Sequence, residues 1–231
     1  MSGLAPIVDD RWSRRFSGAY DRVFEDVERT FLGPLRSRLV GGLRGRVVEI
    51  GAGTGANVGH YRAADRVDLV EPLPSMRARL DARLASREAS REPTGEAPGM
   101  RGIPMQVTDG RAEALPFPDA SADAVVSTLV LCSVSDVERT LDEVRRVLAP
   151  GGVFAFLEHS RGRGLKRGVQ TAITPVTRRL CGNCHHDRDL AGAIGRAGFD
   201  QVEAVPVPSP LRVRVLPEWP LVAGHASDPL R

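Results

Sequence analysis

The chain has 231 residues, of which 42% are hydrophobic and 26% charged, and its formal net charge is only +3. These values exclude a disordered or collagen-like chain, and we expect no nucleic-acid partner because the basic residues are interspersed with acids. Three cysteines give no disulfide framework, and no apolar run approaches the roughly 20 residues of a membrane span. We therefore expect one soluble, cytoplasmic domain over residues 1–231.

The N-terminal part of the chain, residues 1–45, is predicted to be a helical cap. Apolar residues recur at helical spacing between residues 11 and 40, and Gly18 and Gly33 interrupt that pattern. Tyr20 lies within this cap.

From residue 46 onward, short β-branched runs alternate with helical ones. This alternation is typical of an α/β domain in which strand-helix-strand units build a parallel sheet. We predict strands over residues 46–51, 66–71, 103–109, 123–130, 152–159 and 200–207, and a last edge strand near 220–226.

The clearest predicted helix begins at residue 135. Ser135 and Glu138 have the spacing of a capping box, and Pro150 with Gly151 marks the end of the helix. Further helices are predicted over residues 75–84 and 188–198.

The segment 160–188 follows the fifth predicted strand and has no clean period. Loops at the carboxyl ends of parallel strands line the ligand crevice, so we expect this segment to be a substrate loop. Its basic residues could bind a carboxylate or phosphate of the substrate or touch an anionic membrane, and a solvated loop is the alternative. They are Arg161, Arg163, Lys166 and Arg167.

The stretch VVEIGAGTGANV, residues 47–58, joins an apolar strand to three closely spaced glycines, Gly51, Gly53 and Gly55. Such a loop lets backbone amides approach a polar ligand, but the third glycine comes one position too early for the dinucleotide fingerprint. This early glycine disfavours a nicotinamide-dependent oxidoreductase. Glu71, at the end of the next strand, has two oxygens that can accept hydrogen bonds from ribose hydroxyls.

Glu49 precedes these glycines, and the resulting pattern, acid-x-Gly-x-Gly-x-Gly, resembles motif I of the class I S-adenosylmethionine-dependent methyltransferases. Residues 110–134 resemble the adenine-side loop and fourth strand of that family, and residues 141–160 resemble its next helix, Pro-Gly-Gly turn and fifth strand. The resemblance covers roughly residues 15–205. It implies a Rossmann-like, seven-stranded, mostly parallel sheet with helices on both faces and an N-terminal helical lid, and S-adenosylmethionine as the cofactor.

The resemblance also assigns residues to the cofactor site. Leu73 and Met76 would pack on the adenine, and Tyr20 would cover the cofactor unless it serves ordinary core packing. Many relatives have an aspartate where this chain has Arg111, which has only donors, so backbone atoms or Glu113 would have to accept from the adenine. The implied set is Tyr20, Glu49, Gly51, Ala52, Gly53, Gly55, Glu71, Pro72, Leu73, Met76, Arg111, Ala112, Glu113, Thr128 and Leu129.

The segments STLVLCSV, LEHS and GNCHHDRDL are similar to the methyltransferase-like 7 group, which includes thiol S-methyltransferases. They favour a small-molecule acceptor with a thiol sulfur. Menaquinone or ubiquinone C-methyltransferases and phospholipid N-methyltransferases are also similar, so a quinol, a phospholipid amine or a natural product is the alternative. A non-catalytic module that only binds S-adenosylmethionine is a second alternative.

His159 ends the fifth predicted strand and is the candidate for orienting or deprotonating the acceptor, with a backbone hydrogen bond as its alternative role. Cys132 fits either a place near the active centre or a small buried position. CGNCHH invites a zinc interpretation, but its donors come from one short segment and relatives carry only its second cysteine, so we predict no metal site. The oligomeric state is left open.

Overall fold

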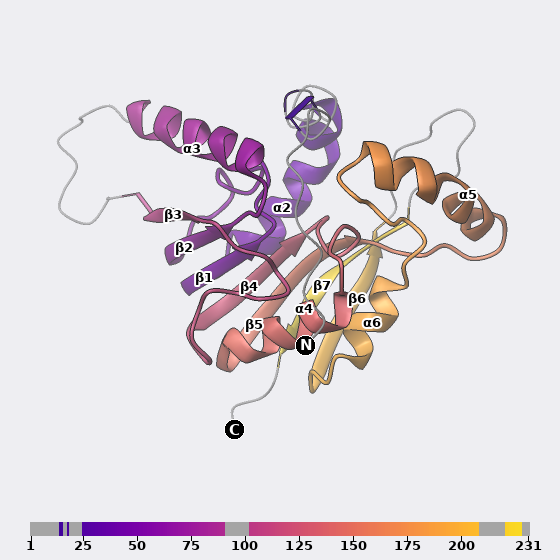
Figure 1. The fold of residues 1–231 in the computed structure, drawn as a ribbon. Helices are drawn as coiled ribbons and strands as arrows, with labels where there is room; N and C mark the ends of the chain where they lie inside the picture. Colours follow the sequence, from indigo (N-terminus) through magenta and orange to yellow (C-terminus); the bar gives the residue numbers. More distant parts are fainter. Residues whose placement is uncertain (1–13, 16–17, 19–24, 91–101, 208–219, 228–231) are drawn as a thin grey trace.

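The computed structural model describes residues 14–15, 18, 25–90, 102–207 and 220–227. Within them, one seven-stranded sheet has the strand order β3-β2-β1-β4-β5-β7-β6. The strands are β1 (Gly45–Ile50), β2 (Ala64–Val70), β3 (Met105–Thr108), β4 (Ala122–Thr128), β5 (Leu148–His159), β6 (Gln201–Val207) and β7 (Leu221–Ser227). Strands β1 to β5 pair in parallel, and β7 runs antiparallel to β5 and β6. The predicted Rossmann-like sheet is confirmed (Figure 1).

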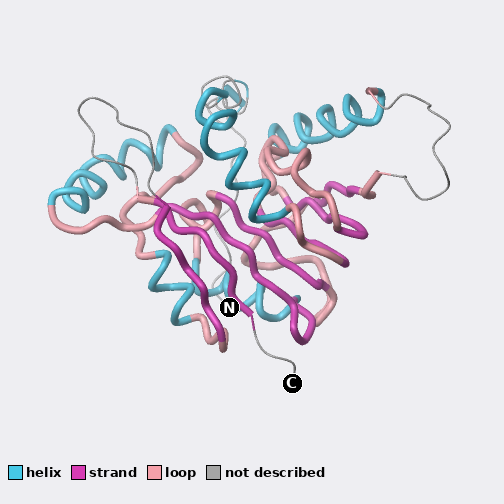
Figure 2. The backbone as a smooth tube through the Cα atoms, turned by 180° about the vertical axis from the view of Figure 1, so that it is seen from behind, coloured by secondary structure: helices cyan, strands magenta, loops and turns pink. Residues whose placement is uncertain are grey.

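Helices cover both faces of the sheet (Figures 1 and 2). Because of this cover, the central strands read as continuous apolar runs, and Val47, Val48 and Ile50 of β1 are fully buried. Helices α2 and α3 pack on one face, and α4 and α6 pack on the other. The helical elements are η1 (Glu28–Leu32), α2 (Gly33–Val40), α3 (Pro74–Ala89), α4 (Val137–Val147), α5 (Leu165–Leu180) and α6 (Leu190–Arg196).

The parallel strands place their carboxyl ends at one edge of the sheet, which positions the site. Of the predicted N-terminal cap, the structure describes η1 and α2 together with a few earlier residues. None of the described helices is both long and apolar enough to cross a membrane.

The prediction that the last strand lies at the sheet edge is wrong. Strand β7 is inserted between β5 and β6, and it pairs with β5 along its whole length, from Leu221 with His159 to Ser227 with Val153. Strand β6 takes the edge instead. Its Pro206 has no N–H to donate to a further strand, which suits an edge position.

The predicted capping box at Ser135 is displaced by one residue. Helix α4 begins after Asp136, whose Oδ1 accepts a hydrogen bond from the backbone N–H of Arg139 at 3.0 Å. The backbone N–H of Ser135 is engaged elsewhere, because it donates to Oε1 of Glu113 at 2.7 Å.

Most of the predicted substrate loop is helical. Residues 165–180 form α5, which extends away from the sheet beyond the end of β5 (Figure 1). Gly168 and Pro175 lie inside this helix and interrupt its sequence pattern, since neither is a good helix former.

Leu141 anchors α4 to the sheet and is almost fully buried. We expect Leu141→Ala to lower the free energy of unfolding by about 2–5 kcal/mol because it removes buried apolar contacts and leaves a cavity. Denaturant titration would measure this. The control Asp142→Ala changes an exposed residue of the same helix and should stay within about 0.5 kcal/mol; equal losses in the two variants would contradict the packing described.

Candidate functional site

The loop after β1 is a series of tight turns. Three backbone hydrogen bonds within it span three residues each, for example from the N–H of Gly55 to the oxygen of Ala52 at 2.9 Å. Gly51, Gly53 and Gly55 have φ angles of +59°, +58° and +86°, which L side chains rarely adopt. The glycines therefore set the path of this loop.

The three glycines have different surroundings. A Cβ on Gly51 would lie 2.5 Å from Val130, and one on Gly55 would lie 2.6 Å from Leu80, so these two glycines permit close packing. A Cβ on Gly53 would meet no atom closer than 3.9 Å. Gly53 therefore borders the space into which a ligand can approach the backbone.

Glu71 lies beside this loop with its carboxylate buried. Oε2 accepts from the N–H of Gly53 and Oε1 from the N–H of Leu73, both at 2.9 Å. Burial raises the pKa of Glu71, although these two hydrogen bonds act against that effect. Because a carboxylate oxygen can accept a second hydrogen bond, both oxygens can also bind the two hydroxyls of a ribose.

Glu49 supports the loop from inside the protein. Its oxygens accept from the hydroxyl of Tyr61 at 2.6 Å and from Nδ2 of Asn57 at 3.0 Å. Burial raises the pKa of Glu49 to about 7 despite these hydrogen bonds. Both oxygens thus have protein partners.

Arg36 of α2 extends this buried network to the end of β4. Its Nη1 donates to Oδ1 of Asn57 at 3.0 Å and to Oγ1 of Thr128 at 2.7 Å, and its Nε donates to Glu28 at 2.6 Å. Nothing in the sequence spacing of Arg36, Asn57 and Tyr61 marks them as neighbours, so the sequence alone does not predict this network. Of the three, only Asn57 lies inside the stretch VVEIGAGTGANV that the sequence marks as a candidate site.

The loop after β3 holds Arg111, Ala112 and Glu113. Oε1 of Glu113 accepts from the backbone N–H of Ser135 at 2.7 Å and from Arg111 at 3.3 Å. Burial alone would raise the pKa of Glu113, but the hydrogen bonds from Arg111 and Ser135 lower it overall. Glu113 thus fixes Arg111 and the start of α4.

The structure brings the described residues predicted for the cofactor to one edge of the sheet. Most of them follow the carboxyl ends of β1, β2, β3 and β4, while Glu49 lies within β1 and Thr128 is the last residue of β4. Met76 is buried in the first turn of α3. Tyr20 lies outside the described residues. Leu129, after β4, has a φ angle of +61°, and its N–H donates to the oxygen of Leu157 at 2.8 Å.

Glu158 holds the turn that follows β4. Its Oε1 accepts from the hydroxyl of Ser127 at 2.6 Å and from the N–H groups of Val130 and Leu131 at 3.1 and 3.2 Å. Burial raises the pKa of this fully buried carboxyl to about 7. The turn continues into Cys132, so Glu158 fixes the position of this cysteine.

Cys132, His159 and Cys184 form a compact cluster at the ends of β4 and β5. The two Sγ atoms are 3.2 Å apart, and Nδ1 of His159 lies 3.4 Å from Cys132 and 3.7 Å from Cys184. The hydrogen bond from Cys184 is the main cause that lowers the pKa of Cys132. Burial lowers the pKa of His159, but Cys132 outweighs this effect and raises it overall.

The cluster differs from the donor set that CGNCHH suggested. Of that segment, only Cys184 belongs to the group of three donors whose ligand atoms all lie within 4.8 Å of one another. Cys181 is half-buried and lies outside this group.

The basic cluster lies around the start of α5. Arg161, Arg163 and Arg167 are exposed, and Arg161 lies 3.7 Å from Oδ2 of Asp189. Binding of this basic cluster to an anionic group of the substrate or to a membrane stays a prediction.

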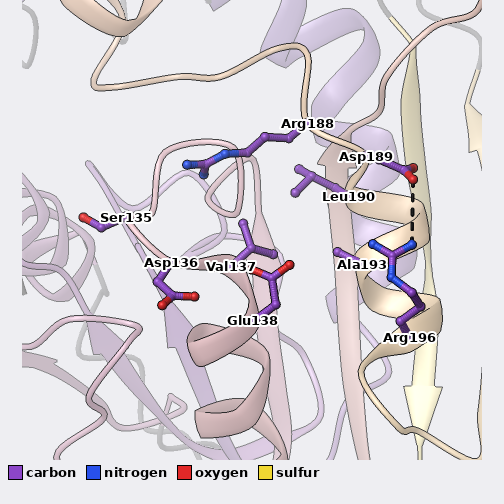
Figure 3. Close-up of a pocket in the computed structure, with 9 residues that line it drawn as sticks. All are labelled: Ser135, Asp136, Val137, Glu138, Arg188, Asp189, Leu190, Ala193 and Arg196. Atoms are coloured by element: carbon purple, nitrogen blue, oxygen red, sulfur yellow. Dashed lines mark ion pairs between the residues drawn. The ribbon is translucent and has the colours of Figure 1, made fainter. Parts of the chain in front are cut away.

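A hollow of about 410 Å³ lies between the beginnings of α4 and α6 (Figure 3). Arg188 and Glu138 border it, and Asp189 pairs with Arg196 at 3.9 Å along its wall. None of its lining residues belongs to the set predicted for the cofactor, and no residue of the glycine loop lines it; Arg188 is the last residue of the predicted substrate loop.

Comparison with known proteins agrees with this geometry. A family model described as a methyltransferase domain matches residues 48–156. Thiol S-methyltransferase TMT1A from Homo sapiens is 33% identical over 184 residues, which cover 78% of this chain and 67% of that protein. The chain belongs to the class I S-adenosylmethionine-dependent methyltransferases. It is thus an enzyme whose cofactor is S-adenosylmethionine.

Two further similarities place this methyltransferase among its relatives. Ubiquinone/menaquinone biosynthesis C-methyltransferase UbiE from Caulobacter vibrioides is 52% identical over 54 residues, which cover 23% of this chain and 21% of that protein. The crystal structure of a methyltransferase from Thermotoga maritima has a TM-score of 0.62 at 23% identity, covering 94% of this chain and 98% of that one. The latter similarity shows the shared fold.

The open space beside Gly53 gives a test of cofactor binding. We expect Gly53→Ala to weaken S-adenosylmethionine binding by roughly tenfold or more, because the added Cβ occupies that space and strains the left-handed backbone. Calorimetric titration would measure the affinity. Gly59→Ala is the matched control, since its Cβ would meet nothing within 4 Å; equal affinities for the two variants would exclude this loop as the cofactor site.

The buried carboxyl of Glu49 should make stability depend on pH. Its folded-state pKa of about 7 lies above the ordinary 4.5, so its contribution is fully present below pH 4.5 and is lost as the pH rises to about 7. The loss amounts to about 3 kcal/mol. Glu49→Gln should remove this part of the pH dependence in denaturant titrations at about pH 5 and about pH 8.

Glu203→Gln, which changes an exposed carboxylate of β6, is the control and should leave the pH dependence as it is in the wild type. The same pH dependence in Glu49→Gln and in the wild type would show that Glu49 is not the titrating group.

Proposed function

We propose that this enzyme transfers the methyl group of S-adenosylmethionine to the sulfur of a small-molecule thiol. The observation that carries the proposal is the similarity to four thiol S-methyltransferases of human, rat and mouse, which are 33–34% identical and cover 78–80% of this chain. The similarities to quinone C-methyltransferases cover less of the chain, 23% for one of them and 49% for another, which makes a quinol the weaker alternative.

We assign the cofactor to the carboxyl edge of β1 to β4. The backbone at Gly53 approaches the bound molecule, and the oxygens of Glu71 accept from the ribose hydroxyls. Thr128 and Leu129 lie nearest the methyl group. The remaining members of the proposed set are Tyr20, Glu49, Gly51, Ala52, Gly55, Pro72, Leu73, Met76, Arg111, Ala112 and Glu113.

A thiol suits this site because it needs little activation. S-adenosylmethionine supplies an electrophilic methyl group, and transfer from a sulfonium is an in-line displacement that depends on the position of the nucleophile. With an ordinary pKa near 8.5, a thiol is already partly ionised at neutral pH. The chain therefore has to bind and align the acceptor more than to remove its proton.

His159 is proposed to orient the acceptor. It ends β5 and is half-buried at the edge that carries Thr128 and Leu129. Its Nδ1 faces the sulfurs of Cys132 and Cys184, which leaves Nε2 as the nitrogen for another partner. This geometry supports the orienting role more than removal of a proton by Nδ1.

The acceptor class can be tested with a panel of a small thiol, a primary amine and a quinol, each incubated with the enzyme and S-adenosylmethionine. We expect methylation of the thiol, detected by mass spectrometry as the methyl thioether. Methylation of the amine or quinol without any of the thiol would overturn the proposed acceptor.

His159→Ala should slow methyl transfer by about 10²-fold or more, the lower range for a group that assists at the reacting atoms. Cofactor affinity should stay the same, because His159 is not among the residues proposed to hold the cofactor. His225→Ala, an exposed histidine of β7, is the control and should keep full activity. A fully active His159→Ala enzyme would leave this histidine with a structural role only.

A further inference from the structure

We propose that Cys132, His159 and Cys184 bind a zinc ion and that the fourth position of this ion receives the acceptor as a thiolate. The zinc site stands on the geometry of the three side chains. The role of the fourth position rests on the proposed function, thiol methylation.

The nitrogen–sulfur distances are those that tetrahedral zinc requires, to within about 0.2 Å, and the two sulfurs would have to separate by about 0.6 Å when the ion binds. Bonds of about 2.3 Å to sulfur and about 2.0 Å to nitrogen place a sulfur and a nitrogen about 3.6 Å apart and two sulfurs about 3.8 Å apart. The distances from Nδ1 of His159 to the two sulfurs are 3.4 and 3.7 Å, and the sulfurs are 3.2 Å apart. A disulfide would need about 2.05 Å, which is much shorter.

Each of the three donors is held by a different part of the fold. Cys132 follows the turn that Glu158 fixes, and His159 is the last residue of β5. The oxygen of Cys184 accepts from the hydroxyl of Thr177 at 2.9 Å, and the N–H of His185 donates to the oxygen of Cys132 at 2.8 Å. Donors held in place before a metal arrives are what a metal site needs.

Arg188 joins these segments further. Its Nη1 donates to the backbone oxygens of Leu131 and Val134 at 2.9 and 2.8 Å. The segment after α5 is therefore fastened to the turn after β4 by three hydrogen bonds, two from Arg188 and one from the N–H of His185. The approach of Cys184 to Cys132, 52 residues apart in sequence, is a property of the fold.

Charge supports a cation at this place. Cys132 and Cys184 are buried side by side and Cys184 donates a hydrogen bond to Cys132, so both sulfurs can be ionised together only when a cation compensates their charges. Zinc deprotonates the thiols that bind it and neutralises both charges. Among the described residues, Oε2 of the buried neighbour Glu158 has no hydrogen-bond partner, so a nearby positive charge would also stabilise this carboxyl.

The cluster offers three close ligands, and three protein ligands with an open fourth position are typical of catalytic zinc. The next candidate is His186, whose Nδ1 lies 3.5 Å from Sγ of Cys184 and whose ring meets the ring of His159 edge-on at 4.6 Å. His186 is not part of the group of three mutually close donors. We therefore place it beside the site and not in it.

The open position would serve the reaction by binding the acceptor sulfur. A thiol that binds zinc loses its proton to solvent and stays ionised at neutral pH. Its lone pair forms the new sulfur–carbon bond while the carbon–sulfonium bond breaks. The electron pair of the broken bond stays with the cofactor sulfur, which becomes a neutral thioether. No oxidant or further reactant is needed.

Metal content tests the zinc site without reference to activity. The full-length protein, purified with a phosphine reductant and no chelator, should contain about one zinc ion per chain by plasma mass spectrometry. Cys132→Ser and Cys184→Ser should lose it, while Cys181→Ser, in the same segment as Cys184 but outside the cluster, should keep it. Thermal unfolding would verify that each variant is folded.

Two histidine variants separate an open site from a closed one. His159→Gln should weaken zinc binding by at least roughly tenfold, since even partners outside the ligand set cost this much. His186→Gln should bind zinc as the wild type does. Equal losses in both would indicate four protein ligands and would overturn the open position.

Cobalt substitution tests the acceptor. The Co²⁺ enzyme should show the intense visible bands of a tetrahedral thiolate site, and these should shift when 2-mercaptoethanol binds. Unchanged bands at saturating thiol would overturn the open position. A purified protein that contains no zinc would overturn the metal site, and so would a Cys132–Cys184 disulfide in the reduced preparation. A Cys181→Ser variant that loses as much zinc as Cys132→Ser would do the same.

The zinc site and the proposed function can fail separately. Thiol methylation at an unchanged rate by metal-free enzyme would overturn the zinc inference and leave the proposed function standing. Zinc binding together with methylation of amines or quinols only would overturn the proposed function and the acceptor role, while the metal site itself would stand.

Discussion

Four buried glutamates hold the carboxyl edge of the sheet together, and the site depends on them. Glu49 and Glu71 bind the glycine loop from two sides, Glu113 binds the start of α4, and Glu158 binds the turn after β4. Loops at this edge have exposed N–H groups that no strand or helix satisfies, and a carboxylate is the side chain best able to accept several of them. Each glutamate thus converts a flexible connection into a fixed wall of the crevice.

This construction costs stability. Burial raises the pKa of Glu49 and Glu158 to about 7, so near neutral pH their ionisation is opposed by an unfavourable environment. Elsewhere the sheet is built mainly from apolar residues, and its buried Asp68 is paired with Arg46 and Arg66. Sites that must present polar groups in a defined geometry commonly give up stability in this way.

Local patterns predicted the strands and the glycine loop because their causes are local. A strand covered on both faces needs a continuous apolar run, and Gly53 is needed where φ is positive. The predictions of the α4 cap and of the sheet edge are wrong because residues distant in sequence determine both features. Glu113, 22 residues away, takes the N–H of Ser135 and shifts the cap to Asp136, and the insertion of β7 beside β5 depends on pairing that no short window contains.

The cluster of Cys132, His159 and Cys184 shows the same limit at the acceptor end. The short spacing within CGNCHH suggests a donor set, yet short spacing is neither necessary nor sufficient for donors to meet, and Cys181 lies outside the group. Parallel strands bring the ends of β4 and β5 together whatever their separation in sequence, and the segment after α5 is then hydrogen-bonded across them. The edge that gathers oxygen acceptors for the cofactor thereby also gathers soft sulfur and nitrogen donors, so the chemistry available to the acceptor follows from the topology of the sheet.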